Sequence, residues 1–364
     1  MTSVPEEVRS LKGVKPLIVT TGIAKAGLLK RLTSLLDDEK IPYGIFSEVE
    51  PDPGFDVVEK GRRAFREGQH DILIALGGGS SIDAAKIISG LATNEGAVRD
   101  YSGTVVFKND PVPVIAIPTT AGTGSEVTQT GMVMDKDQKR KISIRSPQLL
   151  PKTAILDPTL LHSLSPQTIV YTGMDAFTHA VESFLSLRSN LMTQQLSLSA
   201  ARLIYLSLIP FKENPKDNEL GSKMLHGSCL AGMAFTNCGL GAVHALAYPI
   251  ESYYHIPHGL ACALFLGRVL RENKDAALEK YCDLLGALGI IPQGSSPEGS
   301  AERLIEAVEG FMKKAEIPAN LTALGIKHEV QPMMIEDAIE SLSWRAIPKK
   351  FDRDKVTELL TSVG

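Results

Sequence analysis

Short apolar runs alternate with amphipathic stretches through the first half of the chain. Runs rich in Val, Ile and Leu that are bounded by turn residues predict strands, whereas apolar residues three or four apart predict helices. The predicted strands cover residues 16–20, 43–46, 71–76, 112–117, 132–134, 141–144 and 153–156. The predicted helices cover residues 26–39, 55–67 and 81–91, and the strands at 132–134 and 141–144 form a predicted hairpin. This alternation is typical of an α/β domain with a mostly parallel sheet.

The pattern changes after Asp157 and Pro158, where the strand signals end and helical signals follow one another. Helices are predicted at residues 166–187, 190–209, 217–236, 240–253, 259–271, 274–287, 298–314 and 352–362. Because a chain of 364 residues exceeds the size at which a single core stops growing, two domains are expected. The boundary falls near residues 157–165, which gives an α/β domain at 1–160 and an all-helical domain at 161–364.

Composition and charge narrow the classes of function. The hydrophobic content of 43% and charged content of 22% are those of an ordinary globular protein. The net charge of −4, with Lys and Arg spread along the chain, predicts no nucleic-acid partner and no membrane surface. The N-terminus has no signal-peptide pattern, and no apolar run reaches the ~18 residues of a membrane span. The four cysteines form no Cys-x-x-Cys pair, so we expect reduced thiols in a cytoplasmic protein.

A glycine-rich turn joins the buried strand at 71–76 to the following helix. Three glycines let a ligand approach the backbone, and a helix N-terminus offers free N–H groups and a positive dipole end to a pyrophosphate. The turn consists of Gly77, Gly78, Gly79 and Ser80, which match neither Gly-x-Gly-x-x-Gly nor a P-loop. A tight turn with no ligand also explains this pattern. Asp83 and Lys86, one turn into the helix, either contact sugar or phosphate or form a surface ion pair.

A second polar turn, at residues 118–126, follows the next strand and contains Thr119, Thr120 and Thr123. Ligands bind to open α/β sheets at the carboxyl ends of parallel strands, where this turn is predicted to lie. A solvated loop is the alternative, since Thr and Gly are common loop residues. Two such turns after consecutive predicted strands favour a nucleotide site.

Four residues of the second half form a candidate metal site. Asp175 and His179 are four residues apart, so a helix places both on one face. His244 and His258 lie further along the chain, separated by prolines that exclude an unbroken helix. Together they offer three imidazoles and one carboxylate, a set that suits Fe, Zn, Co or Mn. The other histidines are interpreted as core or surface residues, with His255 as part of a pocket wall.

These motifs occur together and in an order that resembles the iron-containing (group III) alcohol dehydrogenases over nearly the whole chain. The motifs that carry the resemblance are the glycine turn at 77–80 with Asp83 and Lys86, the turn at 118–126, Gly173-Met174-Asp175-Ala176 with His179, the stretch Gly239-Leu240-Gly241-Ala242-Val243-His244, and Pro257-His258-Gly259. The resemblance implies a Rossmann-like N-terminal domain, an all-α C-terminal domain of the dehydroquinate synthase-like type, and an active-site cleft between them. It also implies a divalent iron bound by Asp175, His179, His244 and His258.

The resemblance further implies roles in binding NAD(P). The glycine turn would hold the cofactor pyrophosphate, the three threonines would line the path to the nicotinamide, and a lysine would reach the ribose. The positions that correspond are Gly77, Gly78, Gly79, Ser80, Asp83, Thr119, Thr120, Thr123 and Lys141.

Two positions depart from the family pattern. Family members commonly carry a histidine four residues after the third metal ligand, whereas this chain has Tyr248 there. The resemblance implies that this histidine lies near the substrate and takes part in proton transfer, so Tyr248 is the candidate catalytic residue at its position. A phenol with a pKa near 10 can hydrogen-bond but is a poor proton shuttle at neutral pH, which leaves the proton route open. At the end of the first strand, where NAD-preferring members usually have an aspartate, this chain has Thr21. The missing carboxylate predicts tolerance of NADP(H).

The predicted activity is reversible oxidation of a small alcohol to an aldehyde or ketone, with Fe²⁺ as the metal, Zn²⁺ or another divalent ion as alternatives, and NAD(P)H as cofactor. The family resemblance implies a homodimer. One alternative is a glycerol-dehydrogenase or dehydroquinate-synthase type of enzyme on the same fold. The intact Asp-x-x-x-His pair and the absence of a basic cluster near it argue against this alternative. A non-catalytic nucleotide- or metal-binding sensor is the alternative from another class.

Overall fold

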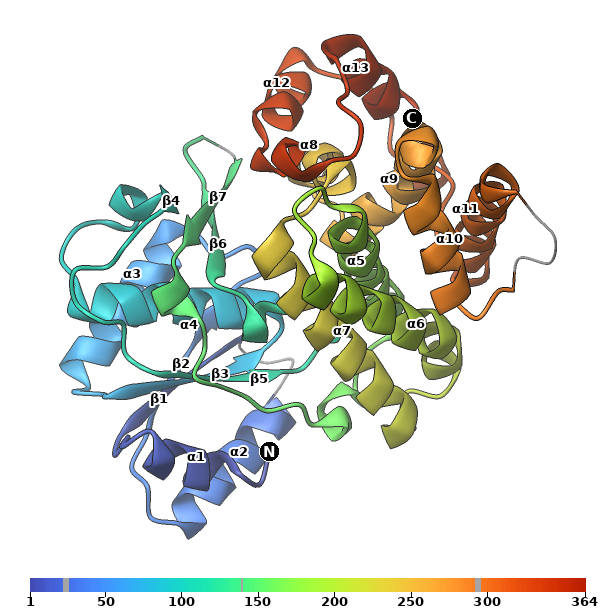
Figure 1. The fold of residues 1–364 in the computed structure, drawn as a ribbon. Coiled ribbons are helices and arrows are strands. Elements are labelled where there is room, and N and C mark those ends of the chain that lie inside the picture. Colours follow the sequence, from blue (N-terminus) through green and yellow to red (C-terminus); the bar gives the residue numbers. More distant parts are fainter. Residues whose placement is uncertain (22–25, 139, 292–295) are drawn as a thin grey trace. The chain divides into compact units, whose positions relative to one another are not determined.

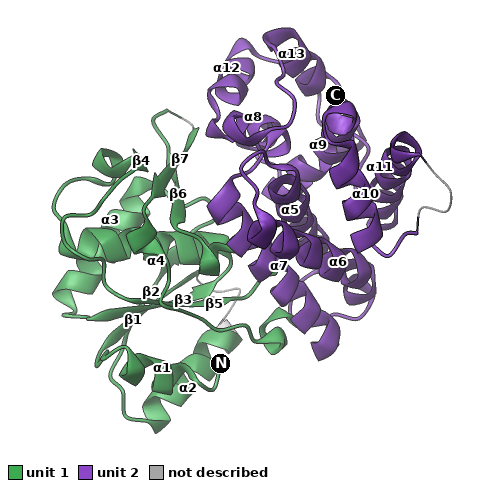
Figure 2. Cartoon of the chain, in the orientation of Figure 1, with its two compact units in different colours: residues 1–162 green, residues 163–364 purple. Residues whose placement is uncertain are grey.

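The computed structural model describes residues 1–21, 26–138, 140–291 and 296–364. The chain divides into two compact units, residues 1–162 and residues 163–364 (Figure 2). The division lies inside the segment 157–165 at which the strand pattern of the sequence ends. An α/β unit followed by a helical unit is the fold class that the sequence predicts.

Unit 1 is organised by a five-stranded sheet with the order β2-β1-β3-β5-β8, in which neighbouring strands run parallel. The strands are β1 (Pro16–Thr21), β2 (Gly44–Val49), β3 (Ile72–Gly77), β5 (Val114–Pro118) and β8 (Thr153–Ala154). The strand order reverses direction between β1 and β3, the type of position at which open α/β sheets bind ligands. The predicted strands therefore form the expected parallel sheet.

Both faces of this sheet are covered by helices, which explains why its strands are apolar along their whole length. Leu17 and Val19 pack into a core on the face with α3 (Phe55–Glu67) and α4 (Gly79–Thr93). Ile18, between them, points to the other face, where α1 and α2 lie (Figure 1). These two helices span Val4–Ser10 and Ala26–Asp38.

A smaller sheet of order β4-β7-β6 completes unit 1. The antiparallel strands β6 (Thr130–Asp135) and β7 (Arg140–Arg145) are the predicted hairpin. Strand β4 (Gly103–Thr104) and helix α1 were not predicted from the sequence. Strand β4 is too short to show a period, whereas α1 carries a weak signal, since its buried Val4 and Val8 are four residues apart.

Unit 2 contains helices and no strand among its described residues. Its helices are α5 (Pro166–Leu185), α6 (Leu191–Glu213), α7 (Asn218–Cys238), α8 (Ala242–Tyr254), α9 (His258–Asn273), α10 (Leu278–Ala287), α11 (Pro297–Lys314), α12 (Pro332–Glu340) and α13 (Arg353–Thr361). All except α12 overlap predicted helices. The sequence signal of α12 is small because only Met334 and Ala338 of this helix are buried.

Among the described residues, no single helix is long and apolar enough to cross a membrane, and α7 and α8 meet this test only as a pair bent by 105°.

Candidate metal centre

Helix α5 brings a carboxylate and an imidazole to one buried face. The helix begins after Ser165, whose side chain caps it by accepting a hydrogen bond from the Thr168 N–H group. Asp175 and His179 lie one turn apart in its middle, and both are almost fully buried. Their Oδ1 and Nε2 atoms are 3.5 Å apart. The i, i+4 spacing thus places both groups where the sequence predicts.

Helices α8 and α9 supply the other two histidines. His244 lies in the first turn of α8, and His258 is the first residue of α9. Between them, His255 ends α8 in a left-handed conformation and is exposed, so it reverses the chain and does not line a buried wall. Gly259 allows the start of α9 to touch α5, because a Cβ atom there would lie 1.8 Å from the Tyr171 carbonyl oxygen.

The donor atoms converge at distances that fit a single metal ion. Asp175 Oδ1 lies 3.7 Å from His244 Nε2 and 3.5 Å from His258 Nε2. Ligands with bonds near 2.1 Å in tetrahedral geometry lie about 3.4 Å apart. Within the described chain, Asp175 Oδ1 and His244 Nε2 are buried and lack a hydrogen-bond partner. Such buried, unsatisfied atoms are costly unless an ion fills the space between them.

Two glutamates orient the imidazoles by contacting their Nδ1 atoms. Glu182, on α5, lies with Oε2 2.5 Å from His244 Nδ1, and its Oε1 accepts a hydrogen bond from the Val243 N–H group. Glu251, on α8, lies 2.9 Å from His258 Nδ1. Because an ionised carboxylate only accepts, each Nδ1 donates and each Nε2 faces Asp175. The sequence analysis missed both glutamates, although Glu251 is seven residues before His258.

Opposite charges gather at this site. Burial alone raises the pKa of Asp175, but His179, His258 and His244 outweigh it and hold the pKa well below its usual value. Burial lowers the pKa of His244 and of His258, yet the surrounding acidic groups raise both well above the ordinary value. A divalent cation would balance these acidic groups, and its binding to neutral imidazoles would release any protons they carry.

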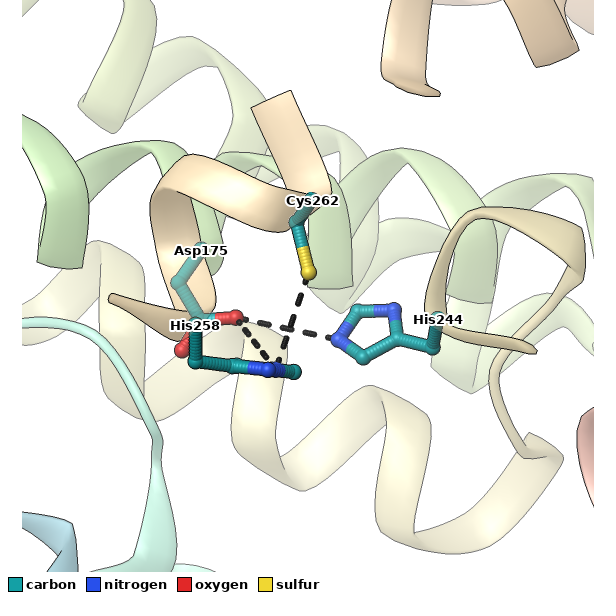
Figure 3. A group of neighbouring side chains, drawn as sticks. All are labelled: Asp175, His244, His258 and Cys262. Atoms are coloured by element: carbon teal, nitrogen blue, oxygen red, sulfur yellow. Dashed lines mark hydrogen bonds and ion pairs between the residues drawn. The ribbon is translucent and has the colours of Figure 1, made fainter. Parts of the chain in front are cut away.

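Cys262 is a further residue of the site that the sequence analysis took for an ordinary thiol. It lies on α9, one turn after His258, and its Sγ atom is 3.6 Å from His258 Nε2. Figure 3 shows its side chain directed toward the same centre as Asp175, His244 and His258. The donor atoms of these four residues all lie within 4.8 Å of one another. The signal in the sequence was the i, i+4 spacing from a candidate ligand.

The predicted nucleotide-binding residues gather at one edge of the sheet in unit 1. Gly77 ends β3, Gly78 caps α4, and α4 starts at Gly79. Strand β5 pairs with β3 so that Gly77 is opposite Pro118, and the Thr119 N–H group donates to the Gly77 carbonyl oxygen. The glycine turn and the threonine turn are therefore adjacent, at the carboxyl ends of neighbouring strands.

The threonine side chains lie directly against the glycines. A Cβ atom at Gly78 would be 3.2 Å from Thr120 Oγ1, and one at Gly79 would be 2.7 Å from Thr123 Cγ2. Side chains larger than hydrogen would therefore fill the space over the N-terminus of α4. Ser80, in the first turn of this helix, is half-buried. The two turns thus meet at the N-terminus of α4, the part of a helix whose free N–H groups can bind a phosphate.

Thr21 and Lys141 lie in different sheets of unit 1. Thr21 is the last residue of β1, the strand next to β3, so it lies at the same carboxyl edge as the glycine turn. Lys141 is on β7, and its Nζ atom is 2.7 Å from Asp52 Oδ1. A role for Lys141 at the ribose remains a prediction.

Two protein-family models match the chain. The model described as "Iron-containing alcohol dehydrogenase" matches residues 1–158, and the model described as "Fe-containing alcohol dehydrogenase family, C-terminal" matches residues 169–364. The chain belongs to the iron-containing alcohol dehydrogenase family. It is 35% identical to alcohol dehydrogenase 4 of Saccharomyces cerevisiae, covering 95% of this chain and 90% of that protein.

Solved structures agree with this assignment to the iron-containing alcohol dehydrogenases. A crystal structure of 1,3-propanediol oxidoreductase superimposes with a TM-score of 0.96 at 35% identity, covering 100% of this chain and 95% of that one. Sulfoacetaldehyde reductase from Bifidobacterium kashiwanohense, solved in complex with NAD⁺, gives a TM-score of 0.89 at 25% identity, covering 100% and 94%. The chain is therefore an oxidoreductase of the alcohol dehydrogenase class.

Tyr248, at the position where other family members commonly have a histidine, lies against the metal-site imidazoles. Its ring stacks on that of His258, with centroids 5.4 Å apart and an interplanar angle of 18°. It meets the His244 ring edge-on at 6.1 Å. The departure from the family pattern therefore lies beside the candidate ligands.

Asp83 and Lys86 are not the surface ion pair that the sequence analysis offered as one interpretation. Lys86 is fully buried, and its Nζ atom is 3.1 Å from Asp83 Oδ1. Asp83 also accepts hydrogen bonds from the Ser125 hydroxyl and the Met132 N–H group. Both residues thus tie α4 to the segment that follows the threonine turn. Contact of Asp83 with the cofactor remains a prediction.

Glu126, at the end of the threonine turn, should make the stability of this member of the alcohol dehydrogenase family depend on pH. Burial raises its pKa from 4.5 to about 7. Between these values the folded chain binds the proton and the unfolded chain does not, so stability is greatest below pH ~4.5 and is lost as the pH rises to ~7. The loss amounts to about 3 kcal/mol.

Glu126→Gln removes this titration, so its stabilising effect should be larger at pH 8 than at pH 5. Thermal denaturation of wild type and variant at both pH values checks the prediction. The contributions of the other titrating groups to stability are the same in both proteins and cancel in the difference. An equal effect at the two pH values would contradict it.

Proposed function

We propose that this protein is a metal-dependent, NAD(P)-linked alcohol dehydrogenase that also reduces small aldehydes. The observation that carries the proposal is the convergence of Asp175 and the imidazoles of His244 and His258, with buried atoms that lack hydrogen-bond partners in the described chain. The family membership and the adjacent glycine and threonine turns of unit 1 support it.

Asp175, His179, His244 and His258 would hold the divalent metal. When bound, the metal supplies Lewis acidity toward the substrate oxygen, which favours the alkoxide of an alcohol or polarises a carbonyl. Glu182 and Glu251 keep the imidazoles in the tautomer that presents Nε2. Iron is the metal that the family name indicates, and zinc also fits these donors.

The cofactor would bind in unit 1 with its pyrophosphate at the N-terminus of α4. Because Gly78 and Gly79 have no Cβ, the threonine turn can approach the N-terminus of α4, whose N–H groups a phosphate would contact. Between its pyrophosphate and its nicotinamide, the cofactor would contact Thr119, Thr120 and Thr123. The nicotinamide would accept or donate the hydride.

The function is tested with protein purified anaerobically and analysed for its metal content. Incubation with NAD(P)H and a panel of small aldehydes should consume the reduced cofactor, as followed by its absorbance. Removal of the metal with a chelator should abolish this reaction, and Fe²⁺ or Zn²⁺ should restore it. Full turnover by metal-free protein would refute a metal-dependent mechanism, and no turnover with any substrate at full metal and cofactor occupancy would favour a sensor.

The protein should accept NADP(H) as well as NAD(H), because Thr21 stands where a carboxylate would repel a 2′-phosphate. Thr21→Asp should lower kcat/KM for NADPH by about tenfold or more, which corresponds to about 1.4 kcal/mol. Thr21→Asn, similar in size and neutral, should leave the ratio of the two cofactors nearly unchanged. Steady-state kinetics with each cofactor measures the effect, and a hundredfold preference of the wild type for NAD would overturn the prediction.

A further inference from the structure

A small cavity of unit 2 lies against Glu182, the carboxylate that orients His244. It is enclosed by the three helices that carry the candidate ligands, α5, α8 and α9, and by residues 346–348. The space open to the centre of a water molecule is about 10 Å³. Because a buried water needs about this much space, the cavity has room for one. Of the described residues that line it, only Glu182 and Asn273 have polar side chains.

Asn273, the last residue of α9, contributes a buried amide to this cavity. Its side chain is almost fully buried, and its Oδ1 atom has no hydrogen-bond partner in the described chain. Asn273 is also the N-cap residue of the short helix Lys274–Ala276, yet its side chain makes no capping hydrogen bond. Capping is the usual role of an asparagine at such a position. A buried amide oxygen is costly to leave unpaired, so we expect a donor from outside the chain at this atom.

Glu182 supplies the second polar group of the cavity. Its Oε1 accepts a hydrogen bond from the Val243 N–H group, and its Oε2 lies 2.5 Å from His244 Nδ1. Each carboxylate oxygen has two lone pairs, so each can accept one more hydrogen bond. Gly241 also lines the cavity, and a Cβ atom there would lie 2.8 Å from Glu182 Oε1. The carboxylate therefore lies at the cavity wall.

We propose that this cavity binds one water molecule, which donates one hydrogen bond to Asn273 Oδ1 and the other to the Glu182 carboxylate. A water matches the cavity because it has two protons for two acceptors, whereas the apolar remainder of the lining offers no side-chain ligands to an ion. Asn273 is then a positioning residue that acts through the water and Glu182 to hold the His244 ring with Nε2 toward Asp175. This role of Asn273 rests on the proposed metal-dependent function, whereas the water site does not.

A crystal structure of the metal-free wild type tests the water site directly. It should show a water within about 2.7–3.2 Å of both Asn273 Oδ1 and a carboxylate oxygen of Glu182. A structure in which no water bridges these two residues would overturn the proposal.

A double-mutant cycle tests the positioning role. Asn273→Leu keeps the approximate size of the side chain and removes the amide, so it should weaken Zn²⁺ binding by about tenfold or more. In a Glu182→Met background, the same change should weaken Zn²⁺ binding by less than about twofold, because the carboxylate through which Asn273 acts is gone. An equal loss in both backgrounds would show that Asn273 acts independently of Glu182 and would overturn this role.

Two further variants serve as controls. Asn273→Ser keeps a hydroxyl that can bond to the water, so its affinity for Zn²⁺ should stay close to that of the wild type. A loss equal to that of Asn273→Leu would contradict the contact through water. Asn214→Leu makes the matched change at the exposed C-terminal end of α6 and should leave the affinity unchanged. Failure of the wild type to bind any divalent metal would overturn the proposed function and the role of Asn273, while the crystal structure still decides the water site.

Discussion

His258→Ala is expected to lose most of its bound metal and at least ~10³-fold in kcat/KM, since Lewis-acid catalysis is worth several kcal/mol. His258 Nε2 lies 3.5 Å from Asp175 Oδ1, and its ring is fixed on the other side by Glu251. Removing the imidazole deletes one donor and leaves Glu251 without this partner. Metal analysis together with steady-state kinetics measures both losses.

His226→Ala is the matched control, because His226 is exposed on α7 and bonds to the Ser222 carbonyl oxygen within its own helix. It should retain metal and activity. Trp344 lies in unit 2 beside Phe351, so its fluorescence reports whether this unit is folded in each variant. A folded His258→Ala protein with wild-type metal content and turnover would show that His258 is not a ligand.

The sequence predicted the candidate ligands because two independent signals agreed on them. The i, i+4 spacing placed Asp175 and His179 on one helix face, and the family resemblance joined them to His244 and His258. Glu182, Glu251 and Cys262 were missed for a physical reason. The two glutamates contact histidines that helix packing brings to them, which no local pattern shows. Cys262 did have a local signal, its i, i+4 spacing from His258, but this spacing alone does not distinguish it from an ordinary buried thiol.

The difference between local sequence patterns and tertiary contacts also explains which elements of the fold were predicted. Strands β1 and β3 are apolar on both faces, so their sequence identifies a parallel sheet covered by helices. Helix α12 buries few side chains, and its period was too weak to detect.

For Lys86, sequence spacing left two possibilities, a cofactor contact or a surface ion pair. Its complete burial excludes the second, since burial of a lysine is governed by tertiary contacts that spacing does not encode.

Lys86→Met should lower the stability of unit 1 by about 3–5 kcal/mol, the usual cost of breaking a buried ion pair. The Nζ atom of Lys86 donates to the carbonyl oxygens of Ser125, Thr128 and Thr130 at 3.0, 3.4 and 2.5 Å. Methionine fills most of the volume but leaves these oxygens and the Asp83 carboxylate without their cation. Burial lowers the pKa of Lys86, whereas Asp83 opposes this effect.

Hydrogen exchange locates the loss, because the amides of β3 and β5 report unit 1 and those of α5 to α7 report unit 2. Protection should fall in the first group and stay unchanged in the second. Lys136→Met is the control, since Lys136 is exposed and pairs with Glu50 and Asp56, an arrangement worth less than about 1 kcal/mol. Equally small losses of stability in the two lysine variants would show that Lys86 does not stabilise the packing of α4 against the threonine turn. A loosened turn should also weaken NAD(P) binding without changing metal content, which separates this effect from that of His258→Ala.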